Sequence, residues 1–398
     1  MTALAWDLLE PADVAAFLVP EGLIDRAPEV PWPCRAARLE LPPGGMAALP
    51  FPLPAGVVVL ETPGSGGITA AGAQEAVAAG PRAVVAGPSA GLAQLARAWS
   101  ALATLLTRLD RAPLILRFAD GSAWDLSDRP RLMAILNVTP DSFSDGGLHE
   151  TPAAALAHAE RCFAEGADLL DVGGESTRPG AAPVDEEAES RRVVPVVAAL
   201  RARFPSARLS VDTRRAAVAR RALEAGADLI NDVSAGADPA MLPLAAEAGV
   251  PVALMHMRGE PATMQRHTHY ADLVGEIAEA LESAAGRARE AGIADDRILL
   301  DPGLGFGKSA EGNELLLRQF GALRSLGSPL LIGASRKAFL GRLTGVSDPA
   351  ARLAGSLAAA VVAALRGAAV LRVHDVGATR EALAVAVALR RARGTDGC

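Results

Sequence analysis

The chain has 398 residues, half of them apolar, which exceeds one ordinary domain and suffices for a large packed core. Its formal net charge of −7 argues against a broad nucleic-acid-binding surface. No apolar run is long enough to span a bilayer, and the first residues carry acids where a secretory signal needs basic residues, so we expect a cytoplasmic protein without a membrane partner. Cys34, Cys162 and Cys398 are too widely spaced for a disulfide framework or a zinc cluster.

Two residue types are rare enough to be informative where they occur. Of the 39 basic residues, only Lys308 and Lys337 are lysines, and the rest are arginines. Asparagine occurs only at positions 137, 231 and 313. Because the chain otherwise avoids these side chains, Lys337, Asn137 and Asn231 are candidates for a specific role.

Residues 1–110 are rich in proline and glycine and differ in pattern from the rest of the chain. We predict a small α/β domain here, with strands near 57–60 and 83–86 and a helix from about 91 to 109. The segment has no phosphate loop, no paired carboxylates and no metal cluster, so the sequence assigns no chemistry to it. Packing or assembly is the expected role.

Residues 111–398 contain eight short apolar runs that alternate with longer amphipathic stretches. Buried strands alternating with helices form a parallel sheet, and eight such units in about 250 residues have the size of a (β/α)8 TIM barrel. Before the first run, residues 114–127 contain two apolar stretches joined by Asp120-Gly121, which predicts a β-hairpin under the barrel floor. The predicted barrel strands are 132–136, 168–172, 208–211, 228–230, 252–255, 298–300, 330–334 and 370–373.

Each predicted barrel strand is followed by a polar or charged residue, at the end of the barrel where such folds carry their active sites. One such residue is most often a helix cap or a turn former, but caps do not call for Lys, His and Arg after apolar strands. The set comprises Asn137, 174–178, Asp212, Asn231, Asp232, His256, Asp301, 335–337, Arg372, His374 and Asp375.

These side chains fall into two chemical groups. One group combines donors and acceptors and suits the edge of a flat, amide-like heterocycle; it comprises Asp212, Asn231, Asp301 and Lys337. The other suits a phosphorylated leaving group with Mg²⁺; it comprises Asn137, Arg178, Arg372 and His374. No side chain is placed as an obvious covalent nucleophile, so displacement without a covalent enzyme intermediate is the simplest mechanism.

Residues 303–309, Gly-Leu-Gly-Phe-Gly-Lys-Ser, are similar to a phosphate-binding loop. However, Pro302 stands where the first glycine of that motif belongs, and the segment follows a strand of the barrel series. A nucleotide-binding role is therefore not the expected one.

Several segments, in order along the chain, resemble the signature segments of the dihydropteroate synthase family. The two longest are Asn137–Gly147 (NVTPDSFSDGG) and Gly173–Gly180 (GGESTRPG). The resemblance covers about residues 114 to 395 and leaves out the N-terminal hundred or so. The other matching segments are 210–213, 230–233, 254–257, 301–303, 305–308, 335–337 and 372–375.

The resemblance implies a transferase of folate biosynthesis, a sulfonamide target that works with Mg²⁺. Such enzymes condense 6-hydroxymethyl-7,8-dihydropterin diphosphate with 4-aminobenzoate to give 7,8-dihydropteroate and diphosphate. We expect an SN1-like departure of diphosphate, because the pterin methylene can share positive charge with the ring, followed by attack of the aryl amine. The resemblance also implies a homodimer formed through barrel helices.

The resemblance further implies a role for particular residues. The implied pterin site comprises Asp212, Asn231, Met255, Asp301, Phe306 and Lys337. The implied diphosphate site comprises Asn137, Thr177, Arg178, Arg372 and His374, with Asn137 also binding the metal. The implied 4-aminobenzoate site comprises Arg178, Pro179, Phe306, Ser335 and Lys337, closed by the loops 138–147 and 174–182. The implied catalytic residues are Asp212, Asp301 and Lys337.

Three alternatives remain open at this point. Corrinoid-dependent methyltransferases have similar pterin-binding barrels, but they need neither a diphosphate site nor a Ser-Arg-Lys segment such as 335–337. An inactive pterin-binding scaffold would not require polar groups after all eight strands. A second enzyme of the same pathway in residues 1–110 would need a metal pair or a phosphate loop there, and the sequence has neither.

Overall fold

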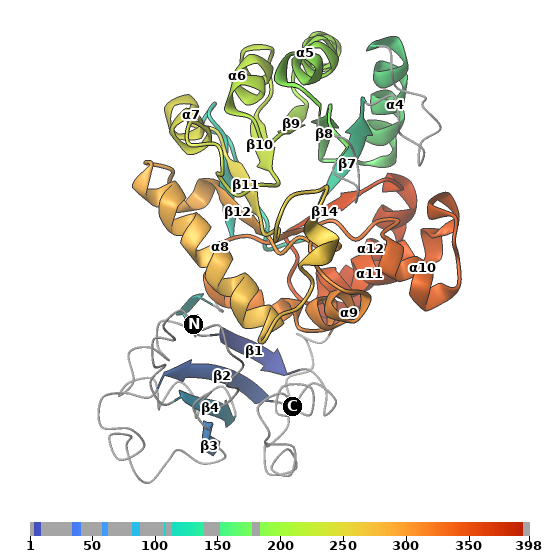
Figure 1. Cartoon of the computed structure of the whole chain (residues 1–398). Coiled ribbons are helices and arrows are strands. Elements are labelled where there is room, and N and C mark those ends of the chain that lie inside the picture. Colours follow the sequence, from blue (N-terminus) through green and yellow to red (C-terminus); the bar gives the residue numbers. More distant parts are fainter. Residues whose placement is uncertain are drawn as a thin grey trace. The chain divides into compact units, whose positions relative to one another are not determined.

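The computed structural model describes residues 4–8, 34–40, 58–62, 82–87, 107–108, 114–138, 152–176 and 184–392. The chain divides into two compact units, and each is considered by itself. In the first unit, four strands form an antiparallel sheet in the order β1-β2-β4-β3 (Figure 1). These strands are β1 (Leu4–Leu8), β2 (Cys34–Glu40), β3 (Val58–Thr62) and β4 (Arg82–Gly87).

The sequence predicts two of these four strands. The predicted strands near 57–60 and 83–86 correspond to β3 and β4. Strands β1 and β2, with the sequences LAWDL and CRAARLE, were not predicted because charged residues interrupt their apolar pattern. The predicted helix at 91–109 falls largely outside the described residues, although Thr107 and Arg108 are helical.

In the second unit, eight parallel strands of the described chain form one sheet in the order β12-β11-β10-β9-β8-β7-β14-β13. A parallel bridge between Leu300 and Leu330, with the Leu300 N–H donating to the Pro329 carbonyl at 3.0 Å, joins the two ends of this order. The predicted TIM barrel is therefore confirmed. Its strands are β7 (Arg131–Asn137), β8 (Leu169–Gly173), β9 (Arg208–Asp212), β10 (Leu229–Asp232), β11 (Val252–Met255), β12 (Ile298–Asp301), β13 (Leu331–Ile332) and β14 (Val370–Val373).

Helices follow each strand and form the outer layer of the barrel (Figure 1). They are α4 (Pro152–Glu165), α5 (Glu186–Arg203), α6 (Ala216–Glu224), α7 (Met241–Ala248), α8 (Leu273–Glu290), α9 (Ala310–Arg318), α10 (Ala338–Thr344), α11 (Leu353–Leu365) and α12 (Val376–Ala392). Short 3-10 helices are η3 (Met264–Arg266), η4 (Asp295–Arg297), η5 (Phe320–Leu326) and η6 (Pro349–Ala351). None of the helices in the described ranges has the length and apolarity needed to traverse a bilayer.

Local sequence signals explain where several of these helices begin and end. Asp185 caps α5 by accepting a hydrogen bond from the Ala188 N–H at 2.7 Å, and Ser309 caps α9 by accepting one from Gly312 at 3.0 Å. Gly249 ends α7 with a φ of 64°, a left-handed conformation that glycine adopts without strain. These caps fix the helix ends next to the loops of the barrel.

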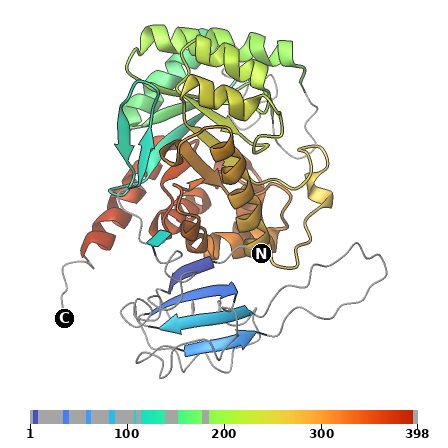
Figure 2. The ribbon, with the colours of Figure 1, turned by 90° about the vertical axis from the view of Figure 1, so that its left-hand side faces the viewer.

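A β-hairpin closes the floor of the barrel, the end where the strands begin. Strands β5 (Ile115–Arg117) and β6 (Ala123–Asp125) pair antiparallel, as predicted for residues 114–127. Leu116 and Phe118 are fully buried in a cluster with residues near the strand starts, among them Leu169, Leu229 and Leu331. Figure 2 shows the hairpin, in teal, at the left side of the barrel.

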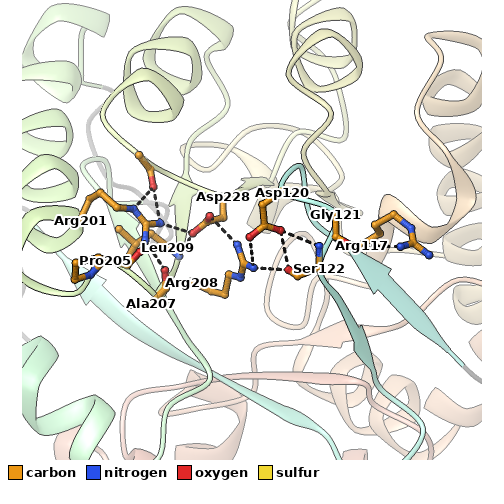
Figure 3. Close-up of polar contacts among 11 residues, drawn as sticks. Arg117, Asp120, Gly121, Ser122, Arg201, Pro205, Ala207, Arg208, Leu209 and Asp228 are labelled. Carbon is orange, nitrogen blue, oxygen red and sulfur yellow. Dashed lines mark hydrogen bonds and ion pairs between the residues drawn. The ribbon is translucent and has the colours of Figure 1, made fainter.

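The floor also carries a network of paired charges. Asp228, just before β10, accepts hydrogen bonds from Arg201 at 2.6 Å, from Arg208 at 3.0 Å and from the Leu209 N–H at 2.8 Å (Figure 3). Asp168, just before β8, is bonded in the same way to Arg129, Arg131 and the Leu132 N–H. The repeated segments 165–172 and 225–232 therefore form equivalent units, in which one carboxylate ties two neighbouring strands together.

Candidate active site

A cavity of about 720 Å³ lies at the carboxyl end of the barrel strands. All eight strands, or the segments directly after them, contribute side chains to it. Every sequence-predicted site residue within the described ranges lines this cavity, so the structure brings the set together. These residues are Asn137, Asp212, Asn231, Met255, Asp301, Phe306, Ser335, Lys337, Arg372 and His374.

Arg372 lies at the centre of a charged cluster on the inner face of the barrel. Its Nε donates to Asp171 Oδ2 at 2.6 Å, and its Nη2 donates to Asp212 Oδ2 at 2.7 Å. The Asn231 amide donates to the same Asp171 oxygen at 3.0 Å. Arg372 thus joins the residues of the two chemical groups that the sequence separates. Burial works against its charge, yet Asp171 and Asp212 together raise the pKa of Arg372, which keeps the guanidinium charged.

The acidic groups of the cavity are held in conditions that disfavour their charge. Burial raises the pKa of Asp301 to about 6, although the Gly303 N–H, at 2.7 Å from Oδ1, and the nearby cations oppose the rise. Burial also raises the pKa of Asp212, and Arg372 limits that effect. A carboxylate in this state gains from a ligand that brings hydrogen-bond donors, which suits the edge of a heterocycle.

The segment 335–337 and Phe306 form another wall of the cavity. The Lys337 ammonium lies over the Phe306 ring, 4.1 Å from its centroid, and Lys337 directly precedes helix α10. Ser335 is hydrogen-bonded to His374, with 3.0 Å between Oγ and Nδ1. Two residues that the resemblance assigns to different substrates, Ser335 and His374, are therefore direct neighbours.

Several polar residues that follow the strands already have partners within the protein. The Arg336 guanidinium pairs with Asp375 at 2.7 Å, and Asp232 accepts from the Ser234 and Gly236 N–H groups. His256 is only 8% exposed and contacts Lys308. For Asp232 the turn role that the sequence allows for a single residue therefore applies, and Arg336 and His256 are held by other side chains.

Glu175 is a fourth example, and it anchors a loop. It accepts hydrogen bonds from Arg214, Arg215 and the Val184 N–H, the last at 3.1 Å. Glu175 and Val184 are described residues on either side of 177–183, and this hydrogen bond links them. Thr177, Arg178 and Pro179 lie outside the described residues, as does most of the loop 138–147.

The structure adds residues that the sequence reasoning missed. Asp171 is completely buried and binds both Asn231 and Arg372. A carboxylate inside an otherwise apolar strand run was the available signal, because unpaired charges are rarely buried. Gln265 and Lys308 also line the cavity, and both hydrogen-bond to the loop that carries Phe306.

The described residues include no group of three or more His, Cys, Asp or Glu side chains arranged to hold a metal ion. Asn137, the last residue of β7, presents an amide to the cavity beside Gly173. An amide oxygen is one of the ligands that Mg²⁺ accepts, and Mg²⁺ in phosphate sites usually takes its other ligands from water and substrate oxygens. Asn137 therefore fits a metal that binds together with a phosphorylated substrate.

The barrel is similar in sequence to known enzymes. The family model described as "Pterin binding enzyme" matches residues 133–374. Dihydropteroate synthase of Escherichia coli is 48% identical over 276 residues, which are 69% of this chain and 97% of that protein. The Mycobacterium leprae enzyme is 46% identical over 262 residues, 64% of this chain and 92% of its own length.

Solved structures show the same similarity. Yersinia pestis dihydropteroate synthase, solved with a sulfonamide drug, superposes with a TM-score of 0.67 at 49% identity, over 70% of this chain and 100% of that one. The Xanthomonas albilineans enzyme with 4-aminobenzoic acid has a TM-score of 0.65 at 50% identity, over 70% and 99% of the two chains. The same enzyme with 7,8-dihydropteroate has a TM-score of 0.61 at 48% identity, over 68% and 97%.

Proposed function

The chain belongs to the family of pterin-binding enzymes, and we propose that it is a dihydropteroate synthase. It condenses 6-hydroxymethyl-7,8-dihydropterin diphosphate with 4-aminobenzoate and releases 7,8-dihydropteroate and diphosphate. The observation that carries this proposal is a single cavity in which acceptors for a heterocycle adjoin the cations Arg372 and Lys337. Near-complete coverage of the E. coli synthase by this chain supports it.

We assign the pterin to the deep part of the cavity. Asp212, Asn231 and Asp301 offer oxygens to the N–H groups of the pterin edge, and Lys337 donates to its acceptors. Met255, which is 4% exposed, and the Phe306 ring supply apolar surface for the two faces of the ring system. Pterin binding thereby provides partners for carboxylates that burial has destabilised.

The diphosphate is assigned to Asn137, Arg372 and His374. Asp171 and Asp212 engage Nε and Nη2 of Arg372, so Nη1 is the donor that a diphosphate oxygen would use. Mg²⁺ bound to Asn137 and the diphosphate would neutralise charge on the leaving group. Thr177 and Arg178 are further proposed contacts of the diphosphate, on sequence grounds alone.

The reaction then needs little covalent chemistry from the protein. The bond between the methylene carbon and the diphosphate oxygen breaks, and the positive charge spreads into the pterin ring, close to Asp212 and Asp301. The amine of 4-aminobenzoate forms the new C–N bond, and its proton leaves with the diphosphate. Ser335, Lys337, Phe306, Arg178 and Pro179 form the proposed 4-aminobenzoate site, and the flanking loops exclude water.

An assay with purified protein tests this function. With Mg²⁺ present, we expect diphosphate release from the pterin substrate at a steady rate only when 4-aminobenzoate is added, with dihydropteroate as the product. Methyl transfer from a methylated folate without this condensation would instead establish the methyltransferase alternative.

We further propose that the enzyme acts in the cytoplasm as a homodimer. An apolar surface on helices α11 and α12 supports the dimer, since Leu365, Val385 and Leu389 are 43%, 62% and 63% exposed. Light scattering tests the dimer: a monomer at micromolar concentration would contradict it, and Val385→Asp with Leu389→Asp should dissociate it.

A further inference from the structure

The glycine loop, residues 303–308, resembles a phosphate-binding loop in sequence but uses its lysine differently. Lys308 is 2% exposed, and its ammonium points into the protein. It donates to the Gly303 and Phe306 carbonyls, both at 2.9 Å, and it lies 3.0 Å from Nδ1 and 3.4 Å from the carbonyl oxygen of His256. Four acceptors thus surround the three N–H groups of the ammonium, and two of these acceptors are carbonyls of the glycine loop.

The backbone of the glycine loop can adopt this shape only because of its glycines. Gly303, Gly305 and Gly307 all have positive φ values, of 67°, 82° and 63°. A Cβ on Gly303 would lie 2.1 Å from the His256 carbonyl oxygen, so the loop packs directly against the end of β11. In this shape the Gly303 and Phe306 carbonyls converge on Lys308.

Other side chains hold the outer side of the same loop. Asn313 accepts from the Gly305 N–H at 2.6 Å, Gln265 donates to the Gly305 carbonyl at 3.0 Å, and Tyr270 donates to the Gly307 carbonyl at 2.9 Å. Among the described residues, Lys308 donates to the Gly303 and Phe306 carbonyls, and the Phe306 N–H also donates to the Gly303 carbonyl at 3.1 Å. The loop carries two groups of the site: the Gly303 N–H bonded to Asp301, and the Phe306 ring under Lys337.

The chemistry of the pocket around Lys308 requires a compact cation. An ammonium directs three donors tetrahedrally at converging carbonyls, whereas a guanidinium is planar and larger. The chain uses arginine at 37 of its 39 basic positions, yet this position is lysine. Burial and the neighbouring Lys308 lower the pKa of His256 to about 3, so the imidazole is neutral and its Nδ1 can accept a hydrogen bond from Lys308. Burial also lowers the pKa of Lys308 to about 7, so the ammonium form predominates below neutral pH.

We infer that the Lys308 ammonium is the internal cation around which the glycine loop folds, and that Lys308 thereby positions Phe306 and the Gly303 N–H for the pterin. Lys308 is a positioning residue and does not act on the substrate. The inference rests on the proposed function for the identity of the ligand, but the effect on the loop does not depend on it.

Chemical rescue tests this role. In Lys308→Ala, the missing atoms correspond to n-propylammonium. We expect the Kd for the pterin, measured by calorimetry, to rise at least about tenfold, with a smaller change in the KM for 4-aminobenzoate. Added n-propylammonium should restore most of the pterin affinity, whereas the neutral isostere 1-propanol should not. Hydrogen exchange of peptides spanning 303–308 should speed up in the variant and slow again with the amine, with or without pterin.

Two further variants keep the test decisive. Lys308→Met fills the same space without charge and should show the weak pterin binding without rescue. Arg201→Ala removes a cation that holds the Pro205, Ala207 and Gly226 carbonyls at the barrel floor. Arg201→Ala should lower the melting temperature without changing the pterin Kd, and n-propylammonium should not restore the melting temperature.

Several outcomes would overturn the inference. Unchanged pterin affinity in a folded Lys308→Ala protein would do so, as would equal rescue by 1-propanol or an unchanged exchange rate of the glycine loop. Loss of folded protein in both Lys308 variants would also do so, because Lys308 would then support the whole barrel. Suppose that wild-type protein binds pterin but makes no dihydropteroate, while Lys308→Ala shows faster exchange of residues 303–308. The proposed function then fails, and the role of Lys308 stands.

Discussion

The two ends of the barrel use the same residue types to opposite effect. At the floor, hydrogen bonds from Arg129 and the Leu132 N–H outweigh burial and lower the pKa of Asp168. Around the cavity, burial outweighs the neighbouring cations and raises the pKa of Asp301 to about 6. The floor carboxylates are satisfied by the protein itself, whereas the cavity carboxylates still require a partner.

This difference separates the residues that stabilise the fold from those that serve the reaction. A carboxylate with complete protein partners lowers the free energy of the folded state and has nothing left for a ligand. A buried carboxylate with incomplete partners lowers the stability of the ligand-free protein, and a bound ligand that supplies the missing hydrogen bonds restores that stability. The comparison therefore predicts that mutations at the two ends change different measurements.

The largest effect is expected for Asp301→Asn. The amide keeps an acceptor for the Gly303 N–H but loses the negative charge that we propose lies near the reacting carbon, so kcat/KM should fall by roughly 10²–10³-fold. The ligand-free variant should be more stable than wild type by about 1–3 kcal/mol at neutral pH, because a buried charge is removed. Steady-state kinetics and thermal melts on the same samples measure both. If Asp301→Asn lost stability as well as activity, the proposed difference between floor and cavity carboxylates would be wrong.

The pH dependence of pterin binding sharpens the same contrast. The pKa of Asp301 is raised from its ordinary value of 3.8 to about 6 in the folded protein. The contribution of this shift to the free energy of unfolding is therefore fully present below its ordinary pKa of 3.8 and is lost as the pH rises through about 6. The stability gain of Asp301→Asn should therefore shrink towards about pH 4. Affinity for a pterin that does not titrate should weaken up to about tenfold per pH unit below about pH 6 in wild type only. Lys337, Lys308 and Arg372 are the cations that face Asp301.

A moderate effect, on stability alone, is expected for Asp228→Asn at the floor. The substitution weakens two arginine bonds and the bond from the Leu209 N–H, so the free energy of unfolding should fall by about 1–3 kcal/mol. The kcat/KM value should stay within about twofold of wild type. Urea unfolding and kinetics provide the two numbers. A large drop in kcat/KM with little loss of stability would contradict the division of roles.

The smallest effect is expected when the chain starts at Ala112, where the barrel unit begins. Such a protein keeps the floor hairpin and every described cavity residue, so kcat/KM should remain within about twofold. Kinetics and circular dichroism measure the outcome. A well-folded but inactive barrel would show that residues 1–111 contribute to the active site.

The barrel could be predicted from the sequence because its signal is strong and repeated. Strands such as β8 and β12 are buried on both sides, and their apolar runs stand out against the amphipathic helices between them. Strands β1 and β2 lack such runs, and their pairing depends on partners far along the chain. Propensity alone does not reveal such strands.

The sequence predicted many of the side chains of the candidate site, but not Asp171 or Gln265, and not the contacts among them. The strand ends locate Asp212, Asp301 and Lys337, because the topology brings those ends together. The sequence does not show that Arg372 binds Asp171, since the two lie 201 positions apart. Nor does it distinguish His256, which is held by Lys308, from His374, which faces the cavity. Only the packed structure shows which polar groups already have partners.

One oxygen of Asp171 accepts hydrogen bonds from both Asn231 and Arg372. Asn231 belongs to the proposed pterin site and Arg372 to the proposed diphosphate site, so the two halves of one substrate share an anchor. A shared anchor makes the binding of the halves interdependent, and linkage requires that dependence to be reciprocal. If diphosphate draws Arg372 away from Asp171, the carboxylate oxygen is left entirely to Asn231. Free pterin and free diphosphate should then change each other's affinity by the same factor. The departure of diphosphate would correspondingly weaken the binding of the pterin ring.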